Sequence, residues 1–320
     1  MKILVADLDL IDEQFSIDLI DSFPDVDFIY TSSIKEQLIH IKDADVYLGY
    51  PSREVFLAAE NLRWIACTGT GIDTLVSIPE LVNSEIILTN ARGPHAEPMA
   101  NHTLGMVLAL AHRMNETMAD QKRHCWDTMK YNRRIIELAG KTMGILALGD
   151  IGRAIARRAS AFGLKVIAIN KTVVEPPPQG VEEVWGLHRL DDLMKLSDWF
   201  VVTAPFTSET HGLIDKRRLQ LLKKESRIIV ISRGGILNED DLIEALRTKS
   251  IAGAGLDSTA VEPLPSDSPL WDMSNVIISP HISALTPEMW QGRKNIFKEN
   301  LRRFMNGEPF IYVCDKKAGY

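Results

Sequence analysis

Short apolar runs alternate with amphipathic segments along residues 1–90. The apolar runs suit strands that are buried on both faces, and the segments between them repeat apolar residues at helical spacing. Such alternation is typical of parallel sheets whose strands are joined by helices. We therefore expect strands at 2–6, 27–30, 46–50, 64–67 and 86–88, and helices at 12–21, 34–41 and 53–59.

The alternation returns after a long helical segment. Residues 98–118 place Met99, Met106 and Leu110 on one side, which predicts a single long helix with Pro98 in its first turn. A second parallel sheet follows, and the helix predicted at 287–304 comes after it, which allows that helix to return to the first sheet. The expected strands are 143–148, 166–169, 199–203, 228–232, 253–257 and 276–278, with helices at 190–196, 217–222 and 238–248.

A polar segment, 121–132, follows neither the helical nor the strand period and carries Trp126. We interpret it as an exposed arm that packs on a second subunit, because aromatic residues are enriched in such interfaces. The alternative is that Trp126 covers its own domain.

Residues 142–172 read as strand, glycine turn, helix and strand. Gly149 lets a ligand approach the backbone and Gly152 lets the helix pack close to the strand, so the helix N-terminus can present its amides to a pyrophosphate. This arrangement predicts a bound dinucleotide. Two positions depart from the usual fingerprint: Ala147 replaces its first glycine, and Asn170 stands where an acid is usual.

Composition and charge exclude several classes of protein. The chain has 320 residues, of which 45% are apolar and 25% charged, and this length and balance indicate an ordinary globular protein of two domains. The net charge of -7 gives no broad basic surface for nucleic acid or anionic lipid. With no membrane span and no signal-peptide core, we expect a cytoplasmic protein. Cys67, Cys125 and Cys314 lack disulfide or zinc spacing, so we expect free thiols and no metal site.

Several candidate chemical groups follow apolar strands, where open α/β sheets place their ligands. Arg233 stands beside two glycines, Glu262 lies in a loop, and His281 ends a strand, whereas the seven other histidines show no comparable setting. The glycine loop 68–73 has amides that can hold a small anion. The residues alone also allow alternatives without a chemical role. Arg233 could be a surface arginine, Glu262 a solvated acid and His281 a structural histidine, and the loop 68–73 could be a plain strand-to-helix turn.

Together these segments resemble the D-isomer-specific 2-hydroxyacid dehydrogenases over almost the whole chain, and most closely the NADP-preferring glyoxylate/hydroxypyruvate reductases. The resemblance implies two Rossmann-like domains, with a dinucleotide domain (98–285) inserted into a substrate domain (1–97 and 286–320), and a homodimer. The matching motifs are Thr-Gly-Thr-Gly-Ile-Asp at 68–73, the fingerprint at 147–152, Ser-Arg-Gly-Gly at 232–235, Gly-Leu-Asp with Glu-Pro at 255–263, Asp-Ser-Pro-Leu-Trp at 267–271 and Pro-His-Ile at 280–282.

The resemblance also implies roles for individual residues. Arg233 would clamp the substrate carboxylate and polarise the carbonyl, while His281 would donate a proton with its ring fixed by Glu262. Backbone amides of Thr70 and Gly71 would bind the carboxylate, and Ser232 and Asp257 would lie near the nicotinamide carboxamide. The expected cofactor contacts are Gly149, Asp150, Ile151, Gly152, Asn170, Lys171, Thr172, Ala204, Pro205, Ile231, Ser232, Arg233 and Asp257.

The departure at Asn170 bears on the choice of cofactor. An acid at this position would repel the 2′-phosphate of NADP, whereas Asn170 removes that repulsion, Lys171 adds a cation and Thr172 adds a hydroxyl. We therefore predict NADPH, with NADH as the alternative if Lys171 points to solvent. The family commonly has a glutamate where this chain has Asn101, and the sequence gives no reason for that difference.

The sequence leaves several classes of substrate and function possible. Glyoxylate and hydroxypyruvate are favoured, and Glu262 argues against formate dehydrogenases, which carry glutamine there. The chain stops at Tyr320, so we expect no regulatory domain of the kind found in many phosphoglycerate dehydrogenases. One alternative is an NAD-dependent enzyme for a bulkier 2-oxo acid, with Tyr50 and Trp126 as candidate pocket walls. Another is a dinucleotide-sensing, protein-binding module like the C-terminal-binding-protein corepressors, although the long flanking tails of those proteins are missing.

Overall fold

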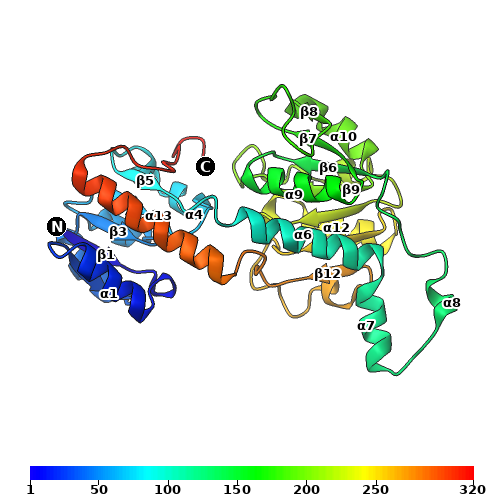
Figure 1. The fold of residues 1–320 in the computed structure, drawn as a ribbon, viewed down its shortest axis with the longest axis horizontal. Helices are drawn as coiled ribbons and strands as arrows, with labels where there is room; N and C mark the ends of the chain where they lie inside the picture. Colours follow the sequence, from blue (N-terminus) through cyan, green and yellow to red (C-terminus); the bar gives the residue numbers. More distant parts are fainter. The chain divides into compact units, whose positions relative to one another are not determined.

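The computed structural model describes residues 1–320, which divide into two compact units. The first unit combines Met1–His95 with Thr286–Tyr320, and the second is Ala96–Leu285. Each unit is built on one parallel sheet with helices packed on it (Figure 1). The predicted α/β class with two parallel sheets is confirmed.

The first sheet has five parallel strands in the order β2-β1-β3-β4-β5. Its central strands are buried because their apolar runs face helices on both sides; Ile3, Leu4 and Val5 are fully covered. The strands are β1 (Lys2–Val5), β2 (Asp27–Tyr30), β3 (Val46–Leu48), β4 (Trp64–Ala66) and β5 (Ile87–Thr89), and the helices are α1 (Glu13–Ser22), α2 (Ile34–His40), α3 (Arg53–Leu57), α4 (Asp73–Val76), α5 (Pro79–Val82) and α13 (Pro287–Asn306).

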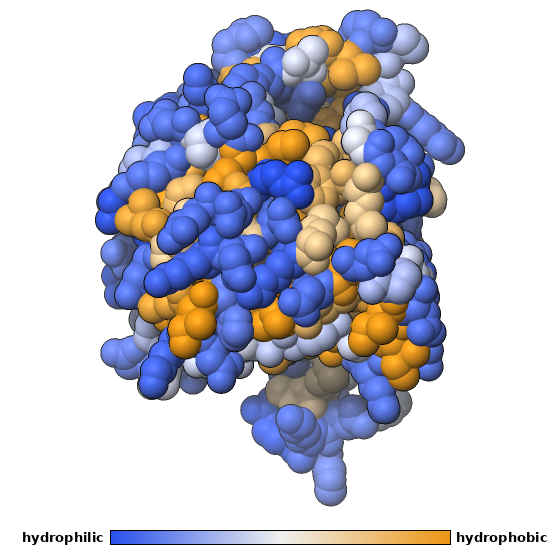
Figure 2. All heavy atoms as spheres, turned by 90° about the vertical axis from the view of Figure 1, so that its left-hand side faces the viewer, coloured by the Kyte–Doolittle hydropathy of each residue, from blue (hydrophilic) through white to orange (hydrophobic).

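The long helix α13 belongs to the first unit although it follows the second sheet in sequence. Its Phe297 stacks on Trp64 of β4 at 5.8 Å between ring centroids, and the indole Nε1 donates to Thr89 Oγ1 at 2.9 Å. The outward face of this unit carries mostly hydrophilic side chains with apolar groups between them (Figure 2). The aromatic core under α13 therefore joins the two sequence-distant segments of the unit.

The second sheet has seven parallel strands in the order β12-β11-β10-β9-β6-β7-β8. From β6 the chain adds β7 and β8 on one side and then β9 to β12 on the other, so the strand order reverses between β6 and β9. Such a reversal opens a crevice at the carboxyl ends of the two strands. β8 was not predicted because its three residues contain too short an apolar pattern. The strands are β6 (Thr142–Leu146), β7 (Lys165–Ile169), β8 (Glu183–Trp185), β9 (Trp199–Val202), β10 (Arg227–Val230), β11 (Gly253–Leu256) and β12 (Val276–Ile278).

Two groups of helices cover the two faces of this sheet (Figure 1). α6 (Ala96–Ala111) and α9 (Asp150–Ala161) pack together on one face, and α10 (Leu190–Leu196), α11 (Lys216–Leu219) and α12 (Glu239–Arg247) pack on the other. α6 comes unusually close to β11 because Gly255 has no side chain: a Cβ there would lie 3.0 Å from Met106 Sδ. None of the helices is long and apolar enough to cross a membrane.

The prediction of one continuous helix over 98–118 is wrong. α6 ends at Ala111, and α7 (Met114–Lys122) begins after Arg113, whose φ of 57° interrupts the helix. Arg113 is held in this turn by its Nε, which donates to the carbonyl of Arg134 at 3.3 Å. The buried apolar side of the segment therefore lies on α6, whereas Met114 on α7 is exposed.

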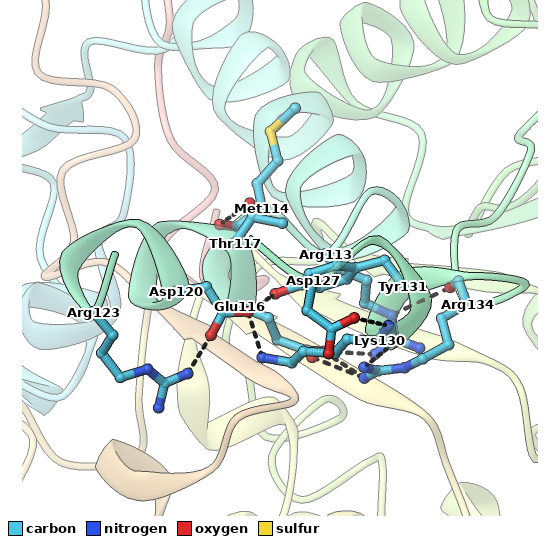
Figure 3. A network of polar contacts seen from close by, with 10 residues as sticks. All are labelled: Arg113, Met114, Glu116, Thr117, Asp120, Arg123, Asp127, Lys130, Tyr131 and Arg134. Atoms are coloured by element: carbon cyan, nitrogen blue, oxygen red, sulfur yellow. Dashed lines mark hydrogen bonds and ion pairs between the residues drawn. The ribbon is translucent and has the colours of Figure 1, made fainter. Parts of the chain in front are cut away.

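In the structure the arm extends beyond the predicted 121–132, because it consists of α7, the following loop and α8 (Thr128–Tyr131), and ion pairs hold it (Figure 3). Both carboxylate oxygens of Glu116 accept from Arg134 at 2.8 Å. Asp120 accepts from Lys130 at 2.6 Å, and that contact is the main reason why the pKa of Asp120 is lowered. Trp126 is 96% exposed, so the alternative that it covers its own domain is wrong.

Candidate active site

The turn after β6 shows how this chain manages without the first fingerprint glycine. Ala147 adopts a φ of 81°, a conformation that ordinarily favours glycine. Its carbonyl accepts from the Thr203 hydroxyl at 2.7 Å, and its N–H donates to the carbonyl of Ile169 at 2.9 Å. These contacts, from the residue that follows β9 and from the last residue of β7, hold the alanine in the strained turn.

The two remaining fingerprint glycines have different surroundings. A Cβ at Gly152 would lie 2.4 Å from the Ala147 carbonyl oxygen, so the turn itself requires glycine there. A Cβ at Gly149 would meet no protein atom within 4 Å. Gly149 caps α9 without a side-chain hydrogen bond, and the N–H groups of Asp150 and Ile151 donate to no protein acceptor. This open helix N-terminus fits the pyrophosphate of a dinucleotide.

The predicted cofactor residues after β7 form a local turn. Asn170 Oδ1 accepts from the Leu148 N–H at 3.2 Å, and its Nδ2 donates to the Thr172 carbonyl at 2.9 Å. Lys171 Nζ lies 3.8 Å from Glu209 Oε2, and both side chains are exposed. The amide of Asn170 thus braces the fingerprint loop, and it adds no negative charge beside Lys171.

The strand ends of β9 and β10 hold the other expected cofactor contacts. Ala204 and Ile231 are buried, and the Pro205 carbonyl accepts from the Thr210 hydroxyl at 2.7 Å. Ser232 Oγ donates to the Val202 carbonyl at 3.3 Å. Contact of these residues with a cofactor stays a prediction.

His281 and Glu262 are brought together as a hydrogen-bonded pair. His281 Nδ1 lies 2.8 Å from Glu262 Oε2, while the other carboxylate oxygen accepts from the Thr259 N–H at 3.1 Å. The His281 backbone has a φ of 55°, and its Nε2 makes no hydrogen bond to the protein. The ring is therefore fixed through Nδ1, and Nε2 is open to a reactant.

Arg233 lies at the same edge of the sheet, because it follows β10 while the Glu262 and His281 loops follow β11 and β12. Its Nη1 donates to the Ser232 carbonyl at 2.9 Å. A Cβ at Gly234 would lie 2.0 Å from the Thr259 carbonyl carbon, so only glycine lets the Arg233 turn abut the segment that holds Glu262.

Asp257 is a buried carboxylate with four polar neighbours. Its Oδ1 accepts from Ser279 Oγ at 2.5 Å and from the Ile282 N–H at 3.0 Å, and its Oδ2 accepts from the Ser283 N–H at 3.1 Å. His102 Nε2 lies 3.7 Å from Oδ1. His102 was not predicted as a site residue; the available signal was its position on the sheet-facing side of a helix.

Thr70 and Gly71 lie in the first unit, in the loop after β4. The Asn90 amide donates to the Thr70 carbonyl at 2.9 Å, and the Tyr50 hydroxyl accepts from the Gly69 N–H at 3.1 Å. The N–H groups of Thr70 and Gly71 donate to no protein acceptor. They satisfy the geometry of an anion-binding loop, and their contact with a substrate stays a prediction.

The structure also explains Asn101, which the sequence did not. Its Oδ1 accepts from Arg158 Nε at 2.7 Å, and the nearby Glu97 accepts from Arg157 at 2.6 Å. Asn101 therefore ties α6 to α9 at the outer surface of the unit.

Comparisons with known proteins agree with this geometry. The family model described as D-isomer specific 2-hydroxyacid dehydrogenase, NAD binding domain, matches residues 104–283. The chain is 34% identical over 288 residues to D-3-phosphoglycerate dehydrogenase of Methanocaldococcus jannaschii, covering 88% of this chain but only 53% of that protein. It is 32% identical over 302 residues to glyoxylate reductase of Thermofilum pendens, covering 89% of this chain and 86% of that protein.

A solved structure resembles the whole chain. It is the NADPH-dependent glyoxylate/hydroxypyruvate reductase of Sinorhizobium meliloti in complex with NADP and sulfate, with a TM-score of 0.85 and 26% identity over 100% of this chain and 99% of that one. The family resemblance drawn from the sequence motifs is confirmed.

Proposed function

Because this chain belongs to the D-isomer specific 2-hydroxyacid dehydrogenase family of NAD(P)-dependent oxidoreductases, we propose that it reduces a small 2-oxo acid to the D-2-hydroxy acid with NADPH. Glyoxylate and hydroxypyruvate are the proposed substrates, in keeping with the names of the T. pendens and S. meliloti relatives. The proposal rests mainly on the His281–Glu262 pair. Nε2 of His281 makes no hydrogen bond to the protein, and the pair follows strands at the sheet edge that also bears Arg233.

The proposed chemistry assigns one task to each side chain. Arg233 binds the substrate carboxylate and polarises the 2-oxo group, which stabilises the charge that develops on oxygen. Glu262 accepts a hydrogen bond from Nδ1–H of His281, which fixes the ring and stabilises the imidazolium. The protonated Nε2 then donates its proton to the substrate oxygen as the hydride arrives, and this leaves a neutral imidazole. The bound cofactor supplies the hydride. In the reverse direction Nε2 takes the hydroxyl proton.

Substitution of His281 tests this assignment. In His281→Ala, turnover should fall by about two to four decades, the range of lost general acid catalysis, while NADPH affinity measured by fluorescence stays within about three-fold. His112→Ala, which changes an exposed histidine, is the matched control. Turnover near the wild-type value in His281→Ala would contradict the proposal.

The proposed preference for NADPH rests on the positive charge of Lys171 and on Asn170, which stands where NAD-preferring relatives have an acid. The Lys171–Glu209 pair is exposed, and such pairs are weak, so a 2′-phosphate can displace the glutamate. Lys171→Ala should lower kcat/KM for NADPH about ten-fold and leave kcat/KM for NADH unchanged. Lys165→Ala, on the exposed start of β7, is the control. A wild-type preference for NADH overturns this part of the proposal.

A panel of 2-oxo acids separates the proposal from its alternatives. Oxidation of NADPH with glyoxylate or hydroxypyruvate supports the small-substrate reductase. Faster NADH oxidation with phenylpyruvate or a branched 2-oxo acid favours the bulkier-substrate enzyme. Tight cofactor binding with no turnover on any acid favours a dinucleotide-sensing module.

We also propose that a second copy of the chain covers the arm. Trp126 is 96% exposed, Met129 73% and Met118 63%, an amount of solvated apolar surface that is unusual for one short segment. Light scattering during gel filtration should report a dimer for the wild type and a larger monomer fraction for Trp126→Ala. A monomeric wild type would refute the proposal.

A further inference from the structure

A chain of polar contacts connects α6 with the turn that carries His281. His102 Nε2 lies 2.8 Å from Ser279 Oγ, and this hydroxyl lies 2.5 Å from Asp257 Oδ1. The Asp257 side chain is fully buried, whereas that of His102 is 25% exposed. The contacts thus run from a partly exposed histidine to a buried carboxylate that binds the backbone next to the proposed proton donor.

The number of protons fixes the direction of these hydrogen bonds. Ser279 has a single hydroxyl proton, which it donates to the carboxylate of Asp257. Ser279 Oγ can then only accept from His102, so Nε2 of His102 carries a proton. His102 therefore orients the hydroxyl of Ser279 toward the buried carboxylate, which needs such donors because burial removes it from water.

Asp257 in turn anchors the backbone around His281. Its two oxygens accept from the N–H groups of Ile282 and Ser283, the residues that directly follow His281. His281 has a φ of 55°, a conformation that is strained for a non-glycine residue and persists only where its surroundings hold it. The position of the His281 ring therefore depends on how Asp257 is held.

The packing of α6 explains why a histidine on that helix reaches this site. Gly255 lets α6 approach β11 so closely that Met106 would contact any side chain at that position. His102 lies about one helical turn before Met106 on the same side of α6 and so faces the carboxyl end of β11, where Asp257 follows.

We propose that His102 is a positioning residue for His281, acting through Ser279 and Asp257. The inference rests on the proposed function, in which Nε2 of His281 donates the proton. His102 does not touch the reactant in this scheme. Its hydrogen bond to Ser279 Oγ orients the Ser279 hydroxyl toward Asp257. Asp257 in turn fixes the position of the strained turn at His281.

Two substitutions of His102 test the idea. Leucine removes the donor, whereas the amide of glutamine can reach the position of the imidazole Nε2. His102→Leu should lower kcat for the 2-oxo acid about ten-fold, the value of one lost hydrogen bond, and His102→Gln should stay within about three-fold of wild type. NADPH affinity and Tm should be equal in the two variants. His112→Leu, just beyond α6 and exposed, is the control. Equal activity of the Leu and Gln variants would overturn the proposal.

Ser279→Ala provides a second variant that keeps the helix intact. Because His102 acts only through the Ser279 hydroxyl, the double variant Ser279→Ala with His102→Leu should lose no more activity than Ser279→Ala alone. Losses that multiply in the double variant refute the shared pathway.

A readout without turnover separates this inference from the proposed function. In protein labelled with ¹³C-histidine, the ring signal of His281 is assigned by its loss in His281→Ala. That signal should shift in His102→Leu and stay in place in His102→Gln and His112→Leu. An unshifted signal in His102→Leu overturns the positioning role. A shifted signal in a protein inactive on every 2-oxo acid supports the positioning role and overturns only the proposed reaction.

Discussion

Two glycine loops, one in each unit, follow a buried parallel strand and precede a helix, yet they are built differently. The loop 68–71 leads into α4, which has only four residues, whereas the loop 147–149 leads into the twelve-residue α9. In the first loop, Gly69 lies against Tyr50, whose hydroxyl would be 2.4 Å from a Cβ there. In the second, Gly149 faces open space.

The difference shows that a strand-to-helix loop can need glycine for more than one physical reason. At Gly152 a side chain would collide with the protein backbone. At Gly69 it would collide with the end of a tyrosine side chain. Of these three glycines, only Gly149 has no protein atom within 4 Å of an added Cβ, and this makes it the best evidence for a ligand among them. A long helix with uncapped amides also offers a larger fixed partial charge than a single helical turn.

The largest effect in this comparison should come from Gly152→Ala. The new Cβ would meet the Ala147 carbonyl oxygen, a backbone atom that cannot move without disturbing the turn. We expect a loss of roughly 2 kcal/mol in unfolding free energy, the usual cost of overpacking, together with loss of measurable NADPH binding. Urea unfolding and cofactor fluorescence provide the measurements. Gly105→Ala, a helical glycine with open space around it, should be neutral or stabilising.

Gly149→Ala should separate binding from stability. No protein atom obstructs the methyl group and φ is -75°, so unfolding free energy should change by less than about 0.5 kcal/mol. The methyl would occupy the space proposed for the pyrophosphate, and NADPH affinity should fall about thirty-fold, or about 2 kcal/mol. Unchanged affinity in a titration would show that the cofactor does not approach this glycine.

The fold followed closely from apolar periodicity because both sheets are buried and their strands are nearly continuous apolar runs. β12 and α10 lie where the pattern predicted them. The break at Arg113 could not be predicted, because it depends on contacts with Arg134, which lies far along the chain. β8 was missed because only its pairing with β7 defines it.

The site was partly predictable for a similar reason. Residues that follow strands, such as His281 and Glu262, could be identified because parallel strands bring their carboxyl ends to one edge. His102 comes from a helix and reaches the site only through the close packing at Gly255. Its role depends on a three-dimensional contact that no local motif records.

A buried thiol beneath the first loop gives that loop a pH dependence that the second lacks. Cys67 Sγ lies 3.6 Å from the carbonyl oxygens of both Gly69 and Gly71, and burial raises the pKa of its thiol from 9.0 to about 11. Below pH 9 the folded and unfolded states both keep the proton. Between pH 9 and 11 only the unfolded chain releases it, so this contribution to stability is lost as pH rises.

Urea unfolding at pH 7.5 and pH 10 measures this effect. The wild type should lose about 1 kcal/mol more than Cys67→Ala over that interval, because only the wild type has the thiol to ionise on unfolding. Cys125→Ala, which removes an exposed thiol, should behave like the wild type. Equal losses in the wild type and Cys67→Ala would show that the thiol beneath the loop is not protected.

The smallest effect should come from Gly69→Ala, in direct contrast to Gly152→Ala. Both new Cβ atoms would lie 2.4 Å from an oxygen, but at Gly69 that oxygen ends the side chain of Tyr50, which is 41% exposed and can rotate away. We expect a cost below about 1 kcal/mol in thermal unfolding. In the Tyr50→Phe background the oxygen is absent, so Gly69→Ala should cost nothing further. If the two costs add instead, the backbone around Gly69 is as rigid as the fingerprint turn, and the contrast between a side-chain and a backbone obstacle fails.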